Sequence, residues 1–247
     1  PAISLTQELR LNAGSFALIS IINLLIKMKK IFTSIAALTL VAQVGFAQIP
    51  SANLVGEWLF DGDGTDGVGN VDATITGAVP TPDRFGNPSS AYQFSSAATY
   101  MNLGDNFDQY LSMNTGAISY SFWVNFDAVN VGNQPLLAKT ADGGCAGDQR
   151  QIIIRLNESQ LEVIGYGSLG PGNFVGVKGA TNLAANQWYH VTVVYHAAQI
   201  TINNSAAAFS IYVNGAAETL SVSTTGGSQL FTFPGIYDGT AHLGIGI

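Results

Sequence analysis

The richest group of possible metal ligands in the sequence is the stretch FDGDGTDGVGNVD, residues 60–72. Calcium in proteins takes about six to eight oxygen atoms from carboxylates and carbonyls on a loop that can bend. The glycines between the acidic residues permit such bends, and Asp63, Asp66 and Asn70 are the first candidates for a structural Ca²⁺ site. The loop is not an EF-hand, because Asp66 stands at its sixth position, where that motif requires glycine. A solvated turn rich in Asp and Gly is the alternative interpretation.

Paired carboxylates would indicate a glycosidase, since retaining enzymes hold two of them about 5 Å apart. The nearest such pair along the sequence is Glu158 and Glu162 in NESQLEV, with Gln160 between them. Glu57 and Glu218 stand apart from any comparable partner. We therefore assign no catalytic residue and expect a non-enzymatic protein, with a polysaccharide hydrolase or lyase as the alternative.

Aromatic side chains among polar neighbours are the candidate carbohydrate-binding residues. Sugar rings present flat apolar faces that stack on aromatic rings, while their hydroxyls bind amides, carboxylates and guanidinium groups. We expect a carbohydrate site on one face of a sheet, formed by Trp123, Asn125, Arg155, Tyr166 and Tyr212. The alternative is that a loop covers Trp123, because large aromatic side chains are usually mostly buried. Trp58 and Trp188 are expected in the core.

The three histidines, His190, His196 and His242, do not have a metal-binding spacing. His190 and His196 fall on the same face of one predicted strand, but about 20 Å apart at the rise of a strand, too far to share an ion. We expect them to be surface residues of strands.

Alternation of apolar and polar residues with a period of two dominates the sequence after residue 53 and predicts half-buried strands. In residues 117–127, AISYSFWVNFD, this alternation places Trp123 on the polar face. Residues 188–196 and 208–215 repeat the pattern, and the second segment ends at Asn-Gly, a hairpin turn signal.

Further strand candidates are short and bounded by Gly, Asn, Asp and Pro. They are residues 54–60, 91–94, 99–103, 135–139, 150–156, 160–166, 173–178, 216–222 and 241–246. Residues 105–113 are expected to form a short helical turn, and 198–207 an enlarged hairpin loop. Many short strands without a long amphipathic helix predict an all-β fold, an antiparallel β-sandwich or jelly roll.

Residues 28–47, MKKIFTSIAALTLVAQVGFA, are expected to be a secretory signal peptide. Two lysines precede an apolar stretch, and the small residues Gly45 and Ala47 fit cleavage after Ala47. The apolar stretch is short for a membrane anchor. Residues 1–27 are interpreted as upstream sequence outside the native domain. The predicted mature domain is 48–247, secreted or located at the cell surface.

The predicted mature domain is strongly acidic. It contains fifteen acidic and five basic residues, a formal charge of −10. Such a surface repels nucleic acids and anionic membranes, so we expect neither as a partner and no membrane insertion of this domain. Cys145 is the single cysteine and cannot form an internal disulfide, so the fold must depend on its core.

Several blocks of the sequence carry a family resemblance when they are taken together. Residues 54–79 look like an opening strand, a glycine-rich acidic loop and a second strand, and 83–105 like a block with Phe-Gly-Asn before a Tyr-x-Phe strand. ISYSFWVNFD and NQWYHVTVVYH with FSIYVNG look like two central strands and a Tyr-Val-Asn-Gly hairpin. In order and spacing, these blocks resemble the laminin-G-like, concanavalin A-like lectin/glucanase superfamily, in its bacterial branch related to pentraxins. The similarity extends over about 54–247.

The resemblance implies the same jelly-roll fold and two details of the acidic residues. Some members bind structural calcium at the acidic loop, helped by an acid in a closing strand with an Ile-Asp-Asp/Glu-Val-Arg motif. This sequence ends at Ile247 before such a motif, so the domain is expected to be incomplete, with an unpaired edge beside 54–60. Laminarinase-like members carry Glu-x-Asp-x-Glu on one strand, which this sequence lacks.

The resemblance implies function only coarsely, because the fold hosts lectins, adhesion modules, hydrolases and structural spacers. We expect an exported, non-catalytic carbohydrate-binding or adhesion module. Its partner would be a glycan or a cell-surface protein, and it would belong to a longer parent chain with other domains. A spacer without any ligand is the second alternative.

Overall fold

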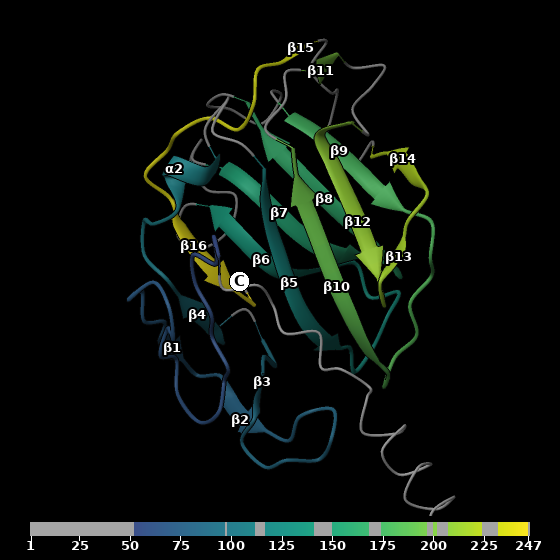
Figure 1. The fold of residues 1–247 in the computed structure, drawn as a ribbon. Helices are drawn as coiled ribbons and strands as arrows, with labels where there is room; N and C mark the ends of the chain where they lie inside the picture. Colours follow the sequence, from purple (N-terminus) through teal and green to yellow (C-terminus); the bar gives the residue numbers. More distant parts are fainter. Residues whose placement is uncertain are drawn as a thin grey trace, which may run out of the picture. The chain divides into compact units, whose positions relative to one another are not determined.

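Short antiparallel strands account for nearly all of the regular structure (Figure 1). The computed structural model describes residues 52–96, 98–111, 117–140, 150–167, 174–196, 200–201, 207–223 and 232–246. The predicted upstream segment 1–27, the signal peptide 28–47 and Cys145 lie outside these residues. In the part of the chain that is described, no helix has the length and hydropathy that crossing a bilayer requires.

The largest sheet has eight strands among the described residues. In spatial order they are β1 (Thr74–Thr76), β4 (Tyr100–Asn102), β16 (His242–Ile245), β6 (Asn133–Thr140), β7 (Arg150–Asn157), β8 (Gln160–Tyr166), β9 (Phe174–Gly179) and β14 (Leu220–Val222). Each neighbouring pair is antiparallel. The all-β antiparallel prediction is therefore confirmed.

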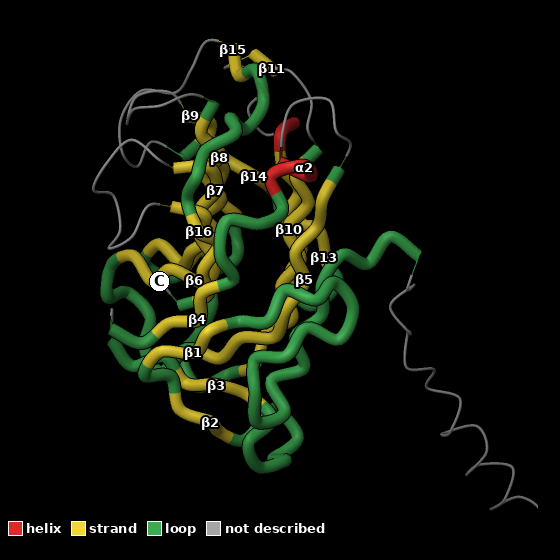
Figure 2. The backbone as a smooth tube through the Cα atoms, turned by 90° about the vertical axis from the view of Figure 1, so that its left-hand side faces the viewer, coloured by secondary structure: helices red, strands yellow, loops and turns green. Residues whose placement is uncertain are grey.

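A second, four-stranded sheet lies against the first, and the two layers are seen edge-on in Figure 2. Its strands in spatial order are β13 (Ala216–Ala217), β12 (Phe209–Val213), β10 (Trp188–Tyr195) and β5 (Ile118–Asn125). Two small ribbons pair β2 (Val79–Thr81) with β3 (Ala91–Gln93) and β11 (Ile200–Thr201) with β15 (Thr232–Phe233). The helical turn α2 (Asp108–Leu111) lies within the predicted helical segment 105–113.

The core between the two sheets follows directly from the period-two alternation. Every second residue of β10 is buried, and the alternate residues of β7 and β8 bury their side chains in the same cluster. Strand β5 pairs with β10 over its whole length, with Val191 opposite Phe122 and His190 opposite Trp123. Burial of these aliphatic and aromatic side chains supplies the main stabilisation, at about 25 cal/mol per Å² of apolar surface.

The Asn-Gly hairpin is formed as predicted. Asn214 and Gly215 connect β12 to β13 with φ angles of 51° and 80°. Positive φ at both positions is what a type I′ turn requires, and Asn-Gly is its preferred sequence. The turn also fixes the register of Tyr212 opposite Ala217.

Three local predictions are corrected by the structure. Residues 54–60 do not form a strand, and their only ladder contact among the described residues is the isolated bridge between Trp58 and Asp66. Residues 216–222 are divided between the two sheets, because β13 pairs with β12 while β14 pairs with β9. Trp188 points away from the core, since it alternates with the buried Tyr189. Its period-two position outweighs the general preference of tryptophan for burial.

Candidate functional site

The surface of the four-stranded sheet that points away from the core carries polar and aromatic side chains. We call it the outer face, and its residues are Ser119, Ser121, Trp123, Asn125, Trp188, His190, Thr192, Val194, Ser210 and Tyr212. Strand alternation turns these side chains outward because their neighbours along each strand point into the core. Strands β5, β10 and β12 lie in front of the larger sheet in Figure 1.

Trp123 is at the centre of an aromatic and cationic group on the outer face. Its side chain is 44% exposed. The His190 ring lies beside it with a centroid separation of 5.1 Å and an interplanar angle of 44°. The Arg84 guanidinium carbon lies 4.2 Å from the Trp123 ring centroid and also 4.2 Å from that of Phe85, which is 69% exposed. These separations are within the range of cation–π attraction.

The turn at residues 83–87 presents Arg84 and Phe85 to the outer face. Asp83 Oδ1 accepts hydrogen bonds from the backbone N–H groups of Phe85 and Asn87 at 2.8 and 2.9 Å, and Asp83 Oδ2 accepts one from Asn87 Nδ2 at 3.0 Å. Burial opposes ionisation of Asp83, but these hydrogen bonds and the nearby Arg84 charge hold its pKa below the usual value. Such Asx turns define the local backbone without any larger element. Arg84 is therefore carried by an ordered turn.

His190 is fixed by neighbouring strands and has a lowered pKa. Its Nε2 lies 2.9 Å from Ser121 Oγ, and its backbone N–H donates to Asn214 Oδ1. Burial lowers the pKa of His190 below its ordinary value, and the positive charge of Arg84 lowers it further. The neutral imidazole is thus the main form at pH 7, which leaves Arg84 as the permanent charge of this group.

The five predicted carbohydrate-binding residues do not lie on one face. Trp123, Asn125 and Tyr212 share the outer face, whereas Arg155 and Tyr166 belong to β7 and β8 of the larger sheet. This corrects the expectation of a single surface, because alternation within a strand does not determine which of two sheets the strand joins.

Arg155 and Tyr166 are engaged within the larger sheet. Arg155 Nε lies 2.6 Å from Glu162 Oε2, and Glu162 is fully buried, with further hydrogen bonds from Asn157 and Ser223. Tyr166 is buried and its ring lies 5.8 Å from that of Phe174. Glu158, in contrast, is exposed in the turn after β7. Glu158 and Glu162 therefore do not form the carboxylate pair of a glycosidase.

Asp66 organises the acidic loop by binding backbone N–H groups. Its Oδ1 accepts from Glu57 and Val68 at 2.9 Å each, and its Oδ2 accepts from Val71 at 3.1 Å. The residue is 7% exposed. Burial opposes ionisation, but the backbone hydrogen bonds outweigh it and hold the Asp66 pKa below its usual value. This carboxylate links Glu57 to the segment 68–71 through backbone hydrogen bonds.

The remaining calcium candidates do not gather around Asp66. Asp63 is exposed and accepts from the backbone N–H of Thr65, and Asn70 is exposed with a φ of 62°. Among the described residues, no three His, Cys, Asp or Glu side chains form a metal-binding group. Both carboxylate oxygens of Asp66 accept backbone N–H groups. The calcium site stays a prediction.

A cavity of about 280 Å³ lies between the acidic loop and α2. Its lining residues include Val55, Val68, Asn106, Phe107 and Tyr110. None of its lining residues has a side chain that is charged at neutral pH.

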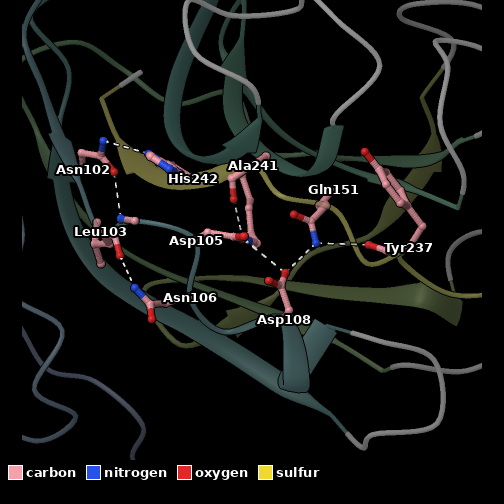
Figure 3. A network of polar contacts seen from close by, with 11 residues as sticks. Asn102, Leu103, Asp105, Asn106, Asp108, Gln151, Tyr237, Ala241 and His242 are labelled. Atoms are coloured by element: carbon pink, nitrogen blue, oxygen red, sulfur yellow. Dashed lines mark hydrogen bonds and ion pairs between the residues drawn. The ribbon is translucent and has the colours of Figure 1, made fainter.

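Lys139 belongs to a buried polar network that the sequence did not reveal, and Figure 3 labels its neighbours Asp105, Asp108 and Ala241. Its side chain is 0% exposed, and Nζ lies 2.6 Å from Asp105 Oδ1 and 3.2 Å from Asp108 Oδ1. Nζ also donates to the carbonyl of Ala241, and Gln151 Nε2 donates to Asp108 Oδ1 at 2.8 Å. The one available signal was a lysine inside the predicted apolar strand 135–139. Its acidic partners lie more than thirty positions away in sequence.

The pKa values of the two carboxyl groups at Lys139 are shifted in opposite directions. Burial would raise the pKa of Asp105, but hydrogen bonds from Lys139 and Asp108 and the charges nearby lower it. Burial raises the pKa of Asp108 above its usual value despite the contacts from Gln151 and Lys139. Both carboxylates lie close together because they contact the same Lys139 ammonium group. We interpret this network as structural.

The architecture agrees with a sequence match to a known family. The sequence model described as "concanavalin A-like lectin/glucanases superfamily" matches residues 95–242, more than half of the chain. The chain belongs to this superfamily. Its members share the sandwich found here, and the matched segment contains both sheets from β4 to the start of β16. No curated protein sequence matches the chain.

Three solved structures with a similar fold are described as binding domains. The binding domain of botulinum neurotoxin DC, solved with rat synaptotagmin II, has a TM-score of 0.52 at 12% identity, over 78% of this chain and 43% of that chain. The botulinum neurotoxin serotype C1 binding domain has a TM-score of 0.51 at 13% identity, over 77% of this chain and 42% of that chain. The binding domain of paraclostridial mosquitocidal protein 1 has a TM-score of 0.50 at 12% identity, over 78% of this chain and 47% of that chain. This superfamily chain spans less than half of each, and the similarity shows the fold alone.

Proposed function

We propose that this chain is a non-catalytic carbohydrate-binding module whose binding surface is the outer face around Trp123. The observation that carries the proposal is the half-exposed Trp123 ring on a sheet surface otherwise rich in hydroxyl and amide groups. An aromatic ring in such surroundings matches a sugar, which has an apolar C–H face and a rim of hydroxyls. A spacer without a ligand has no use for this exposed side chain.

The neighbours of Trp123 supply suitable hydrogen-bonding groups. Asn125 follows it on β5, and Ser121 Oγ lies 3.3 Å from Thr192 Oγ1 in the next row of the sheet. Tyr212 stands opposite Thr192 on β12 and continues this row. These groups lie on paired strands, so we expect little loss of backbone freedom in the protein when a ligand binds.

The charge and the fold support the same class of partner. The charge of −10 in 48–247 opposes binding to nucleic acid and to anionic membranes. The similar structures are named as binding domains, in agreement with a binding module on this fold. A cell-surface protein that carries or replaces the glycan is the second kind of partner. The proposed setting is secreted or at the cell surface, through the signal peptide predicted at 28–47, within a longer parent protein.

Screening the full-length chain on an array of neutral and acidic glycans tests the proposal. Wild-type protein is expected to bind a restricted set, and Trp123→Ala is expected to weaken that binding at least about tenfold, as for a central aromatic contact. The matched control is Val222→Ala, which removes an exposed apolar side chain from β14 in the other sheet. Absence of binding to every glycan, or equal binding by Trp123→Ala, would contradict the proposal.

Turnover of the bound polysaccharide tests its non-catalytic part. Asp105 and Asp108 both contact Lys139, and Glu162 is paired with Arg155. We therefore expect neither new reducing ends nor unsaturated sugar products after prolonged incubation. Product formation that tracks protein concentration would favour the hydrolase or lyase alternative.

A further inference from the structure

Arg84 has an unusual position for a cation in an acidic protein. Its guanidinium carbon lies over the rings of both Trp123 and Phe85, at 4.2 Å from each ring centroid. In the described part of the chain, the ion pairs are made by Lys139 and Arg155, and Arg84 makes none. These contacts hold the group in place without using its hydrogen-bond donors.

Guanidinium geometry determines what such an arrangement can bind. A guanidinium is planar and carries its N–H donors in that plane, and contact with an aromatic ring does not use them as hydrogen-bond donors. Two parallel N–H groups match the two oxygens of a carboxylate, and this bidentate pair is among the stronger hydrogen-bonded contacts. Because two rings already restrict the side chain, less conformational freedom is lost when an anion binds.

The carboxylates near Arg84 are engaged elsewhere. Asp83 accepts three hydrogen bonds within its own turn, from Phe85 and Asn87. Asp127, at the end of β5, accepts from Gln93 Nε2 at 3.2 Å. His190 contacts Ser121 and faces the same group. The free edge of the Arg84 guanidinium is therefore not matched by an acceptor within this surface.

We infer that the outer face selects acidic sugars, with the carboxylate of a hexuronate residue pairing with Arg84 while a sugar ring contacts Trp123 or Phe85. This inference rests on the proposed carbohydrate-binding function and names its ligand class. The charge of −10 over 48–247 gives no general attraction for anions. Selection must then come from this local contact, and short oligosaccharides suit it better than long polyanions, which the rest of the surface repels.

The experiment compares short oligouronates with their methyl esters by calorimetry on the full-length chain. Esterification removes the carboxylate charge and leaves the sugar rings and stereochemistry unchanged. We expect the wild-type chain to bind at least one acid about ten- to a hundredfold more tightly than its ester, the range of a charged hydrogen-bonded contact. Equal affinity for acid and ester across the panel would overturn the inference.

Variants assign the preference to Arg84. Arg84→Met keeps an extended apolar side chain near the rings and is expected to abolish the preference for the acid, so that acid and ester bind with similar affinity. Arg84→Lys keeps the charge without the planar fork and should retain part of the preference. Lys178→Met is the charge-matched control, since Lys178 belongs to β9 of the other sheet. Preference that persists in Arg84→Met would contradict the inference.

The outcomes separate this inference from the function on which it rests. Binding of acids and esters with equal strength, lost in Trp123→Ala, supports carbohydrate binding and rejects selection by Arg84. Absence of binding to both series and to all neutral glycans rejects both.

Discussion

Lys139 and Arg84 are two of the five basic residues in 48–247, and they occupy opposite environments. Lys139 is fully buried, and its ammonium group contacts two carboxylates and a carbonyl. Arg84 lies on an exposed turn, and its guanidinium carbon lies over two aromatic rings. The charge of Lys139 is paired inside the domain, whereas Arg84 forms no ion pair among the described residues.

The difference separates a charge that maintains the fold from one suited to recognition. Taking an ammonium group out of water costs several kcal/mol unless good partners replace its hydration. Asp105, Asp108 and Ala241 supply those partners and join α2 and β16 to β6. Arg84 keeps contact with water at its edge, so no internal partner is needed. Its donors stay available for a ligand.

Replacing Lys139 is expected to have the largest effect and to test this comparison most directly. Lys139→Met leaves Asp105 and Asp108 facing each other without a cation, and we expect a loss of about 3 kcal/mol in the free energy of unfolding. Urea denaturation measures the loss. The control Lys178→Met should change stability by less than about 0.5 kcal/mol. A wild-type midpoint in Lys139→Met would mean that the network contributes specificity rather than stability.

Asp66 extends the comparison of Lys139 and Arg84 to an acidic side chain, whose charge is stabilised by backbone N–H groups. Asp66→Ala leaves the backbone N–H groups of Glu57, Val68 and Val71 without their acceptor, and we expect a cost of about 2 kcal/mol by thermal or chemical denaturation. Asp63→Ala, in the same loop, should have a smaller effect because Asp63 is exposed.

The same variants test the predicted calcium site. Millimolar calcium should raise the melting temperature of the wild-type chain if the loop binds the ion, and the increase should be reduced in Asp63→Ala. An unchanged melting temperature would remove calcium and leave Asp66 as a purely structural carboxylate.

His190 gives the smallest expected effect and sharpens the description of Arg84. The pKa of His190 lies below 6.5 through burial and then through Arg84. Within the described part of the chain, His190 also contacts Ser121, Asn214 and the Trp123 ring, none of which carries a charge. Arg84→Met should therefore raise this pKa part of the way toward 6.5, as measured by NMR. An unchanged pKa of His190 in Arg84→Met would mean that the Arg84 guanidinium lies farther from His190 in solution.

The sign of the corresponding stability change follows from linkage. A folded-state pKa below that of the unfolded chain means that the unfolded chain binds more protons as the pH falls through about 6.5. His190 therefore lowers stability as the solution is acidified through that range. His190→Gln should make the stability of the domain less dependent on pH there. A steeper dependence in this variant would contradict the assignment.

The strands and their faces were predictable to different degrees. The period-two pattern located β5, β10 and β12 and placed Trp123, Asn125 and Tyr212 outward, because alternation depends only on neighbouring residues. It failed at residues 54–60, where Asp66 binds the backbone of Glu57 and only an isolated bridge forms. A loop stabilised by a side chain leaves little trace in hydrophobic periodicity.

The sequence by itself determined an all-β antiparallel sandwich, the Asn-Gly hairpin and the polarity of each strand face. Tertiary structure alone decided that Arg155 and Tyr166 lie on a different sheet from Trp123, that Lys139 meets Asp105 and Asp108, and that the turn at 83–87 brings Arg84 onto Trp123. Local alternation is set by backbone geometry within a few residues. Contacts between residues tens of positions apart depend on sheet order and packing, which no local pattern specifies.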